Sequence, residues 1–291
     1  MIRRIQYKDI NFSQYEKCIG NSVQKNFYAK KEVLDQLSNS WEILVHGDYD
    51  SIMPIPFRKK YGFKIVIMPL FCQQLGIFGA EKNPDIEQQF LNYFRRNYRI
   101  LYYAFNYHNA FKTSLVCKKN YFIPNIDYNL LRKRYFKGRK STVKVAQHLQ
   151  YKEIRLQDEI SFIRTHFKGL QKESDLEKFF EYLAFLEKEK QLKIVGSYLE
   201  NQLTNAAILV ENRDSLALLG LINDEKYRQD NGASFLIDRI LKENIHVKSF
   251  DFMGSIIRGI EVFFKSFGAD LQEYAVIENR KIDLIKNIFR K

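Results

Sequence analysis

The stretch FDFMGSIIRGIEVFFKSFGADLQEY, Phe250–Tyr274, predicts a strand, a helix and a second strand separated by glycines. Gly254 allows the backbone to turn after the first strand, and Ser255 is a candidate N-cap. Gly268 stands where a helix commonly ends. Apolar residues recur between these points at helical spacing, and they are Ile256, Ile257, Ile260, Phe263, Phe264 and Phe267. The stretch therefore predicts one helix between two strands.

The same succession of elements is predicted in both halves of the chain. Each half reads as a strand, two helices, three strands, a helix and a further strand, and the second half adds the helix Ile256–Phe267 and the strand Leu271–Ile277. No GxGxxG follows the first strand of either half, and no GxxxxGK[ST] occurs. The pattern predicts an α/β fold with mixed sheets and excludes the usual signals of a dinucleotide-binding sheet.

The composition is that of an ordinary globular protein, with 45% hydrophobic and 28% charged residues. Three cysteines without CxxC spacing favour a reducing compartment over a disulfide framework. Five scattered histidines give no metal-ligand pattern, so no metal is expected. No signal peptide and no continuous apolar run long enough for a transmembrane helix are found, which predicts a cytoplasmic protein.

The formal charge is +13, and the excess of +6 in residues 128–291 is concentrated in one stretch. Arg132–Lys144 contains seven basic residues and no acidic one, which favours a phosphate-bearing or other polyanionic ligand. Four lysines recur at i, i+4, i+7 and i+11, and they are Lys133, Lys137, Lys140 and Lys144. They would share one helical face, although Gly138 weakens that helix by up to about 1 kcal/mol. A solvated basic helix without a ligand accounts for the same pattern.

Three segments follow from this organisation. Residues 1–127 and 151–291 form the two similar units, and residues 128–150 form a basic helix that links them. The predicted helix Gly232–Lys242 of the second unit begins after a turn that contains Gln229 and Asn231. Free N–H groups at such a helix start can bind phosphate, and Arg228 would add a charge-assisted contact. A simple helix start accounts for these residues equally well.

The repeated order resembles the GNAT acyltransferase fold written twice. Phe263–Ala269 is similar to the aromatic segment ending in glycine that closes the last helix of many GNAT domains. Together with Asp251–Ser255 before it, the segment looks like the Fem-type tandem GNAT aminoacyltransferases that modify peptidoglycan precursors. Lys140–Ala146 also resembles that family.

The resemblance implies transfer of an acyl or aminoacyl group to an amine, with acyl-CoA or aminoacyl-tRNA as the donor. Asp251 or Glu261 would accept the proton of the amine or hold its ammonium, and Lys265 would contact a phosphate or the developing oxyanion. Glu261 and Lys265 also fit an exposed i,i+4 ion pair. The alternative is a non-catalytic, degenerate GNAT pair that binds an anionic ligand such as nucleic acid or a phosphate-bearing metabolite.

Further residues are assigned to the two substrates. The donor would contact Arg228, Gln229, Gly232, Lys140 and Lys144. Gln73, Gln74 and Gly76 would line a polar substrate site in the first unit, because buried amides need partners. Exposure of these amides at the surface is the other interpretation.

Four positions or segments depart from the GNAT pattern. Phe264 stands where many GNAT enzymes have a tyrosine general acid, and Ile257 stands where an asparagine is frequent. The loop that cradles the cofactor pyrophosphate in GNAT domains is one residue off at Gln229–Ser234 and one residue too long at Gln73–Gly79.

Overall fold

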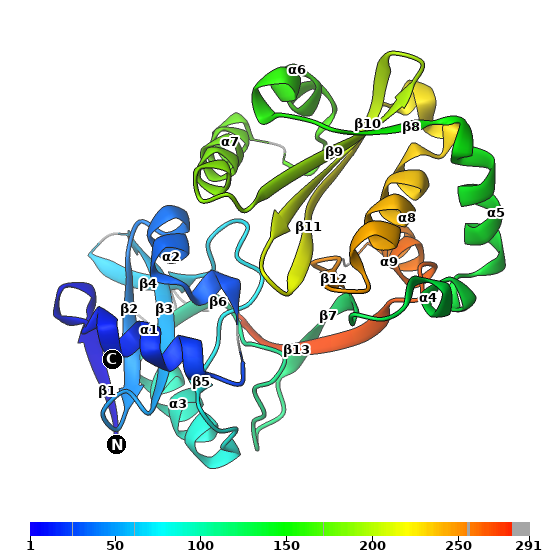
Figure 1. The fold of residues 1–291 in the computed structure, drawn as a ribbon. Helices are drawn as coiled ribbons and strands as arrows, with labels where there is room; N and C mark the ends of the chain where they lie inside the picture. Colours follow the sequence, from blue (N-terminus) through cyan, green and yellow to red (C-terminus); the bar gives the residue numbers. More distant parts are fainter. Residues whose placement is uncertain (25, 61, 171, 255–256, 281–291) are drawn as a thin grey trace. The chain divides into compact units, whose positions relative to one another are not determined.

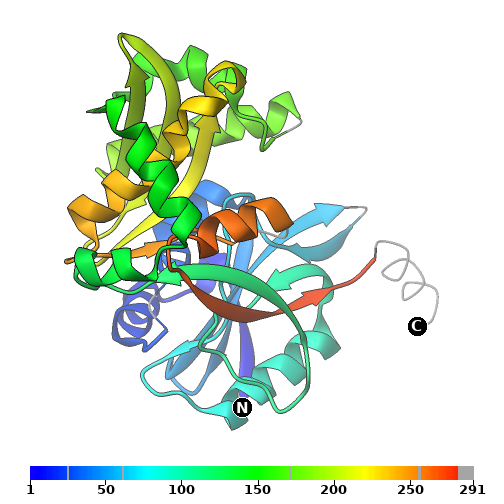
Figure 2. The ribbon, with the colours of Figure 1, turned by 90° about the vertical axis from the view of Figure 1, so that its right-hand side faces the viewer.

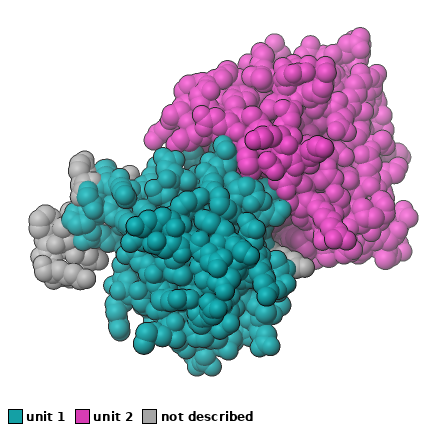
Figure 3. Space-filling view, turned by 60° about the vertical axis from the view of Figure 1, so that its left-hand side comes forward, with its two compact units in different colours: residues 1–118, 273–291 teal, residues 119–272 magenta. Residues whose placement is uncertain are grey.

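The computed structural model describes residues 1–24, 26–60, 62–170, 172–254 and 257–280. Two compact units are present (Figure 3). Unit 1 contains residues 1–118 and the described residues from Glu273 onward, and unit 2 contains residues 119–272. The boundaries predicted at residues 127 and 150 stay a prediction.

Unit 1 is built on the strand order β1-β2-β3-β4-β6-β13, with β5 paired to β3. All the pairings given along β1, β2, β3 and β5 are antiparallel, whereas β4 and β6 are parallel. The elements in chain order are β1 Ile2–Gln6, α1 Phe12–Asn21, α2 Lys31–Leu37, β2 Trp41–His46, β3 Ser51–Lys60, β4 Phe63–Ile67, β5 Phe78–Gly79, α3 Pro84–Asn97, β6 Arg99–Ala104 and β7 Val116–Ile123.

Unit 2 has the strand order β7-β12-β11-β10-β9-β8, in which only β11 and β12 pair in parallel. Its elements are α4 Tyr128–Arg134, α5 Lys137–Val145, β8 Gln150–Glu153, α6 Leu156–His166, α7 Glu173–Lys188, β9 Leu192–Leu199, β10 Gln202–Glu211, β11 Ser215–Asn223, α8 Gly232–Asn244, β12 Ser249–Asp251, α9 Arg258–Lys265 and β13 Asp270–Glu278. β7 and β13 each cross the boundary between the units along the chain.

The predicted repeat of elements is confirmed. Each unit has a strand, two helices, three strands, a helix and then a strand parallel to the third of the three, as Figure 1 shows. The local sequence supports these elements. For example, the side chain of Asn83 accepts hydrogen bonds from the N–H groups of Asp85 and Ile86, and Pro84 occupies the first helical position of α3.

The helix α9 is shorter than the sequence predicts. It runs over Arg258–Lys265, and Gly268 follows with φ +75°, a left-handed conformation that suits a helix end. Only part of the predicted apolar face is buried, because Phe264 and Phe267 enter the core whereas Ile257 is 59% exposed. The N-cap predicted at Ser255, and Ile256 after it, lie outside the described residues.

The single helix predicted over residues 128–150 is wrong. Tyr135 and Phe136 have extended backbones and separate α4 from α5, and α5 packs against α8 in both ribbon views (Figures 1 and 2). Tyr135 is buried with its ring 5.2 Å from that of Phe267, so core packing interrupts the helix. The expected row of four lysines is divided, with Lys133 on α4 and the other three on α5.

Candidate functional site

The parallel pair β11 and β12 separates early, at its carboxyl end. Asp251, the last residue of β12, pairs with Ala217, while β11 continues to Asn223. Met253 and Gly254 then turn with φ of +59° and +71°. Open sheets commonly bind ligands beyond the carboxyl ends of their parallel strands, so the end of β12 is a candidate site.

Asp251 is a carboxylic acid in a desolvated position. Burial raises its pKa from 3.8 to about 6, although hydrogen bonds from the N–H of Met253, at 2.6 Å, and from the side chain of Asn120 oppose this shift. No basic residue is among the causes that raise or lower the pKa of Asp251. A carboxyl group with such a pKa can accept and release a proton near neutral pH.

A second cluster joins β7 to α9. Glu261 Oε1 accepts hydrogen bonds from Tyr121 Oη at 2.5 Å, from Lys265 Nζ at 2.8 Å and from Lys119 Nζ at 3.2 Å. The donation by Lys265, followed by that of Tyr121 and Lys119, lowers the pKa of Glu261 to about 2. Glu261 is therefore a permanent anion, and its contact raises the pKa of Lys265 so that the amine stays charged.

Strand alternation places the two carboxylates on different faces of the sheet. Asp251 pairs with Phe122, and Phe250 pairs with Ile123. Because successive residues of a strand point to opposite faces, Asp251 lies on the face opposite to Tyr121. The structure thus brings the predicted residues Glu261 and Lys265 together and leaves Asp251 apart from them.

Phe264 and Ile257 occupy the two positions that depart from the GNAT pattern. The ring of Phe264 stacks on that of Phe252 with centroids 4.4 Å apart, so it contributes packing. Tyr121, whose hydroxyl contacts Glu261, is a candidate functional residue that the sequence did not reveal. No sequence signal indicates that β7 meets α9.

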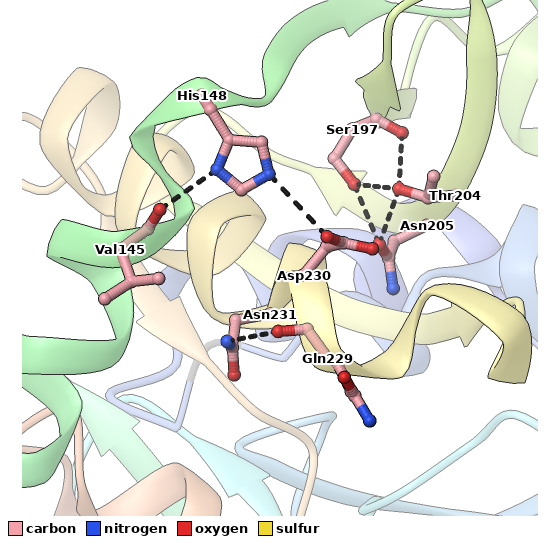
Figure 4. A network of polar contacts seen from close by, with 8 residues as sticks. All are labelled: Val145, His148, Ser197, Thr204, Asn205, Gln229, Asp230 and Asn231. Atoms are coloured by element: carbon pink, nitrogen blue, oxygen red, sulfur yellow. Dashed lines mark hydrogen bonds and ion pairs between the residues drawn. The ribbon is translucent and has the colours of Figure 1, made fainter.

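The predicted donor loop lies at the start of α8 (Figure 4). Gly232 is the first residue of this helix and follows Asn231, whose φ is +60°. Beneath it, Asn205 Oδ1 accepts hydrogen bonds from Ser197 Oγ and Thr204 Oγ1, each at 2.9 Å. A Cβ on residue 232 would lie 1.7 Å from Asn205 Oδ1, so close packing on β10 requires the glycine.

The charges around this loop are mixed. Arg228 and Gln229 are exposed, and the amide of Asn231 donates to the carbonyl of Gln229 at 2.7 Å. Asp230 lies 3.7 Å from His148 Nε2, as Figure 4 shows. α8 has no acidic residue in its first turn, which leaves its N-terminal dipole uncompensated. Binding of donor phosphate at this loop stays a prediction.

Arg139 of α5 is a second residue that the sequence did not single out. Its Nε donates to Ser266 Oγ at 2.8 Å, and a terminal nitrogen donates to Ser234 Oγ in the first turn of α8. Its guanidinium lies 4.4 Å from the ring centroid of Phe263. Burial lowers its pKa to about 10. Arg139 thus connects α5 to both α8 and the end of α9.

Lys140 and Lys144 of α5, which were assigned to the donor, do not take part in the contacts of Arg139. Lys140 Nζ donates to the carbonyl of Lys133 at 3.2 Å, and Lys144 is exposed on α5. Their predicted role in donor binding stays a prediction.

The predicted substrate residues of unit 1 lie between β4 and β5. Gln74 is buried, its Oε1 accepts from the N–H of Tyr107 at 3.0 Å, and its Nε2 donates to Gln73 Oε1 at 3.1 Å. Gly76 has φ +107°, and its N–H donates to the hydroxyl of Tyr103 at 3.0 Å. These contacts hold neighbouring loops together, and the predicted role of Gln73, Gln74 and Gly76 in substrate binding stays a prediction.

Two features are absent from the described residues. No three His, Cys, Asp or Glu side chains gather there in a way that would hold a metal ion. Within the same part of the chain, no helix is both long and apolar enough to cross a membrane.

Comparison with known proteins gives matches at the level of structure. No family model and no curated protein matches the sequence. FemX superposes with a TM-score of 0.68 at 9% identity, over 98% of this chain and 99% of that one. L-PGS from Bacillus licheniformis gives 0.54 at 10% identity, over 96% and 97%. A tandem GNAT protein from the clavulanic acid pathway gives 0.54 at 7% identity, over 95% and 97%.

The fold is a tandem GNAT fold, similar to that of FemX. The matches cover nearly the whole of each chain, so the GNAT-like organisation predicted for both halves is confirmed. In this tandem GNAT fold, β11 and β12 are the parallel pair that separates in unit 2. α9 is the last helix of the described chain, and it carries Glu261 and Lys265.

Proposed function

We propose that the protein is an N-acyltransferase or aminoacyltransferase that moves an acyl or aminoacyl group to an amine. The observation that carries this proposal is the ammonium of Lys265, fixed by Glu261 at 2.8 Å in a tandem GNAT fold. The donor is acyl-CoA or aminoacyl-tRNA, and the protein works in the cytoplasm. Arg228, Gln229 and Gly232 remain the candidate contacts for donor phosphate.

The reaction needs a donor of hydrogen bonds to the carbonyl oxygen and an acceptor for the proton of the amine. Lys265, a permanent cation, supplies the hydrogen bond to the carbonyl oxygen. Glu261 is a poor proton acceptor, because a carboxylate with a pKa of about 2 is too weak a base to take a proton from an amine near neutral pH. The role of Glu261 is to fix Lys265 and to attract the acceptor amine while that amine is still protonated.

Asp251 is the better proton acceptor, because its pKa of about 6 lies close to the operating pH. Asp251 lies on the sheet face opposite to Tyr121 and therefore apart from the pair of Glu261 and Lys265. It belongs to an alternative reaction site at the end of β12, where it would take the proton from the attacking amine without help from Lys265. Nitrogen then bonds to the carbonyl carbon, and the thiol or ribose hydroxyl of the donor leaves with a proton.

The second candidate is a binding protein without catalysis. It is favoured by Phe264, which packs on Phe252 and offers no hydroxyl at the position where many GNAT enzymes have a tyrosine. Such a degenerate pair would bind an anionic ligand, either nucleic acid or a phosphate-bearing metabolite.

The two candidates are separated by a transfer assay with acyl-CoA or aminoacyl-tRNA and a panel of amines. Turnover that falls at least tenfold in Asp251→Asn supports catalysis. Arg164→Gln is the matched control, because it removes an exposed ion pair of α6 in the same unit. Absence of turnover with every donor, together with tight binding of an anionic ligand, would favour the binding protein.

A further inference from the structure

Two short stretches of unit 1 carry a concentration of positive charge that the sequence pattern did not single out. Residues 58–64 at the β3–β4 hairpin and residues 95–99 at the junction of α3 and β6 contain no acidic residue. We call their basic residues the hairpin patch, and they are Arg58, Lys59, Lys60, Lys64, Arg95, Arg96 and Arg99. All but Lys64 and Arg99 are exposed.

The strand register places three residues of the patch, Arg58, Lys60 and Arg99, on one face of the sheet, and Lys59 and Lys64 on the other. Arg58 pairs with Ile65 of β4, and Ile65 pairs with Arg99 of β6. Lys60 pairs with Phe63 in the same hairpin. Since paired residues point to the same side and alternate residues share it, these five side chains lie on one face of β3, β4 and β6, labelled in Figure 1. Because β4 lies between β3 and β6, the backbones at Arg58 and Arg99 are two strand spacings apart, roughly 10 Å.

An aromatic ring lies within this face. The guanidinium of Arg99 is 4.0 Å from the ring centroid of Phe63, which is 37% exposed. Arginine stacked on an accessible ring presents both a charge and a flat surface. The combination is typical of surfaces that contact the backbone and the bases of nucleic acids.

The charge of the patch is poorly balanced within the described residues. Lys64 shares the buried carboxylate of Glu42 with Arg4, each at 2.7 Å, so one anion serves two cations. The described residues provide no ion pair for Arg58 or for the basic pair Arg95 and Arg96. The same holds for Lys59, which stands directly opposite Lys64 in the hairpin. Like charges in that arrangement destabilise a sheet, and an anionic partner would relieve the cost.

We propose that the hairpin patch binds RNA through its phosphate backbone. RNA fits better than an anionic membrane, because a membrane-surface site needs several exposed apolar side chains and Phe63 is the one large exposed apolar residue described in residues 58–64 and 95–99. The binding surface stands on its own observations. Only the further assignment of this RNA as the aminoacyl donor rests on the proposed function.

The test measures binding of fluorescently labelled, deacylated bulk tRNA by anisotropy at several salt concentrations. The patch variant combines Arg58→Gln, Lys60→Gln, Arg95→Gln and Arg96→Gln. The control variant combines Lys8→Gln, Lys17→Gln, Lys178→Gln and Lys188→Gln, which removes the same charge from exposed sites elsewhere. Melting curves verify that both variants fold.

The patch variant is expected to bind tRNA at least tenfold more weakly at moderate salt. The slope of log K against log salt should fall by roughly one for each phosphate that the variant no longer neutralises, and by about four at most. The control should retain the affinity and slope of the unmodified protein. Unchanged binding in the patch variant, or an equal decrease in both variants, would overturn the proposal.

Two further arms separate this proposal from others. Vesicles containing phosphatidylserine should not compete with tRNA, and patch-dependent vesicle binding without tRNA binding would overturn the assignment of RNA. Lys265→Met should lose transfer while keeping tRNA affinity, because Lys265 lies outside the patch. Loss of transfer therefore tests the proposed function, and loss of tRNA binding in the patch variant tests this inference.

Discussion

Tyr121 donates a hydrogen bond of 2.5 Å to Glu261, although 140 positions separate the two residues in the chain. The contact links β7 to α9 within unit 2 and joins the hydroxyl to the ion pair of Glu261 and Lys265. A strand residue thus places a phenol beside the ion pair, whereas Phe264 of α9 offers none. The geometry makes Tyr121 a positioning residue for Lys265.

Tyr121→Phe should lower kcat about tenfold and leave KM for the donor nearly unchanged. The ring keeps its packing, but Glu261 loses one of its three donors and holds Lys265 less firmly. Removal of the hydrogen bond should also lower the free energy of unfolding by about 0.5–1.5 kcal/mol. Steady-state kinetics and urea unfolding measure the two effects. An unchanged kcat would show that the phenol does not position Lys265.

Asp251 should impose a pH dependence on transfer. With its pKa at about 6, kcat/KM should rise as the pH increases through 6 and level off above 7, because only the carboxylate accepts a proton. Asp251→Asn should remove this rise along with most of the activity. A pH profile of kcat/KM that is flat between pH 5 and pH 7 in the unmodified protein would contradict the assignment.

The same carboxyl group should affect stability. Its pKa is raised in the folded protein, so the native state binds more protons than the unfolded state, and stability should fall as the pH rises from about 4 to about 6. A shift from 3.8 to about 6 corresponds to at most about 3 kcal/mol at pH 7. Asp251→Asn should therefore stabilise the protein at pH 7 and flatten this part of its stability profile. Urea unfolding at several pH values measures both, and a less stable Asn variant at pH 7 would oppose the prediction.

Gly232→Ala should destabilise unit 2 by about 1–3 kcal/mol, because the added Cβ would lie 1.7 Å from Asn205 Oδ1. Gly138→Ala is the matched control, since nothing lies within 4 Å of a Cβ at that position in α5. It should stabilise the protein by about 0.5–1 kcal/mol through helix propensity. Thermal melting of both variants gives the comparison, and a Gly232 variant as stable as the control would show that the close packing is not required.

The sequence predicted the order of elements because hydrophobic periodicity and glycine positions are local signals. The left-handed turn at Gly268 after α9 and the pairing of Glu261 with Lys265 depend on local spacing, and both are present. Contacts between segments that are distant in the chain could not be predicted from these local signals. Tyr121 meets Glu261 only because β7 pairs with β12, and that register depends on the whole sheet.

The break between α4 and α5 was missed for a related reason. Gly138 was the expected weak point of the basic helix, yet the backbone leaves the helical conformation at Tyr135 and Phe136. Tyr135 is drawn into the core against Phe267, a residue far away in sequence. Tertiary packing therefore overrides the local preference.

The most direct test of the proposed transfer is single-turnover product formation with aminoacyl-tRNA or acyl-CoA, comparing the unmodified protein with Lys265→Met and Lys265→Arg. We expect product with the unmodified protein and a decrease of at least a hundredfold in rate for Lys265→Met. Lys265→Arg should retain part of the rate, because the positive charge remains. Folded Lys265→Met that forms product at the unmodified rate would contradict the central role of this ammonium.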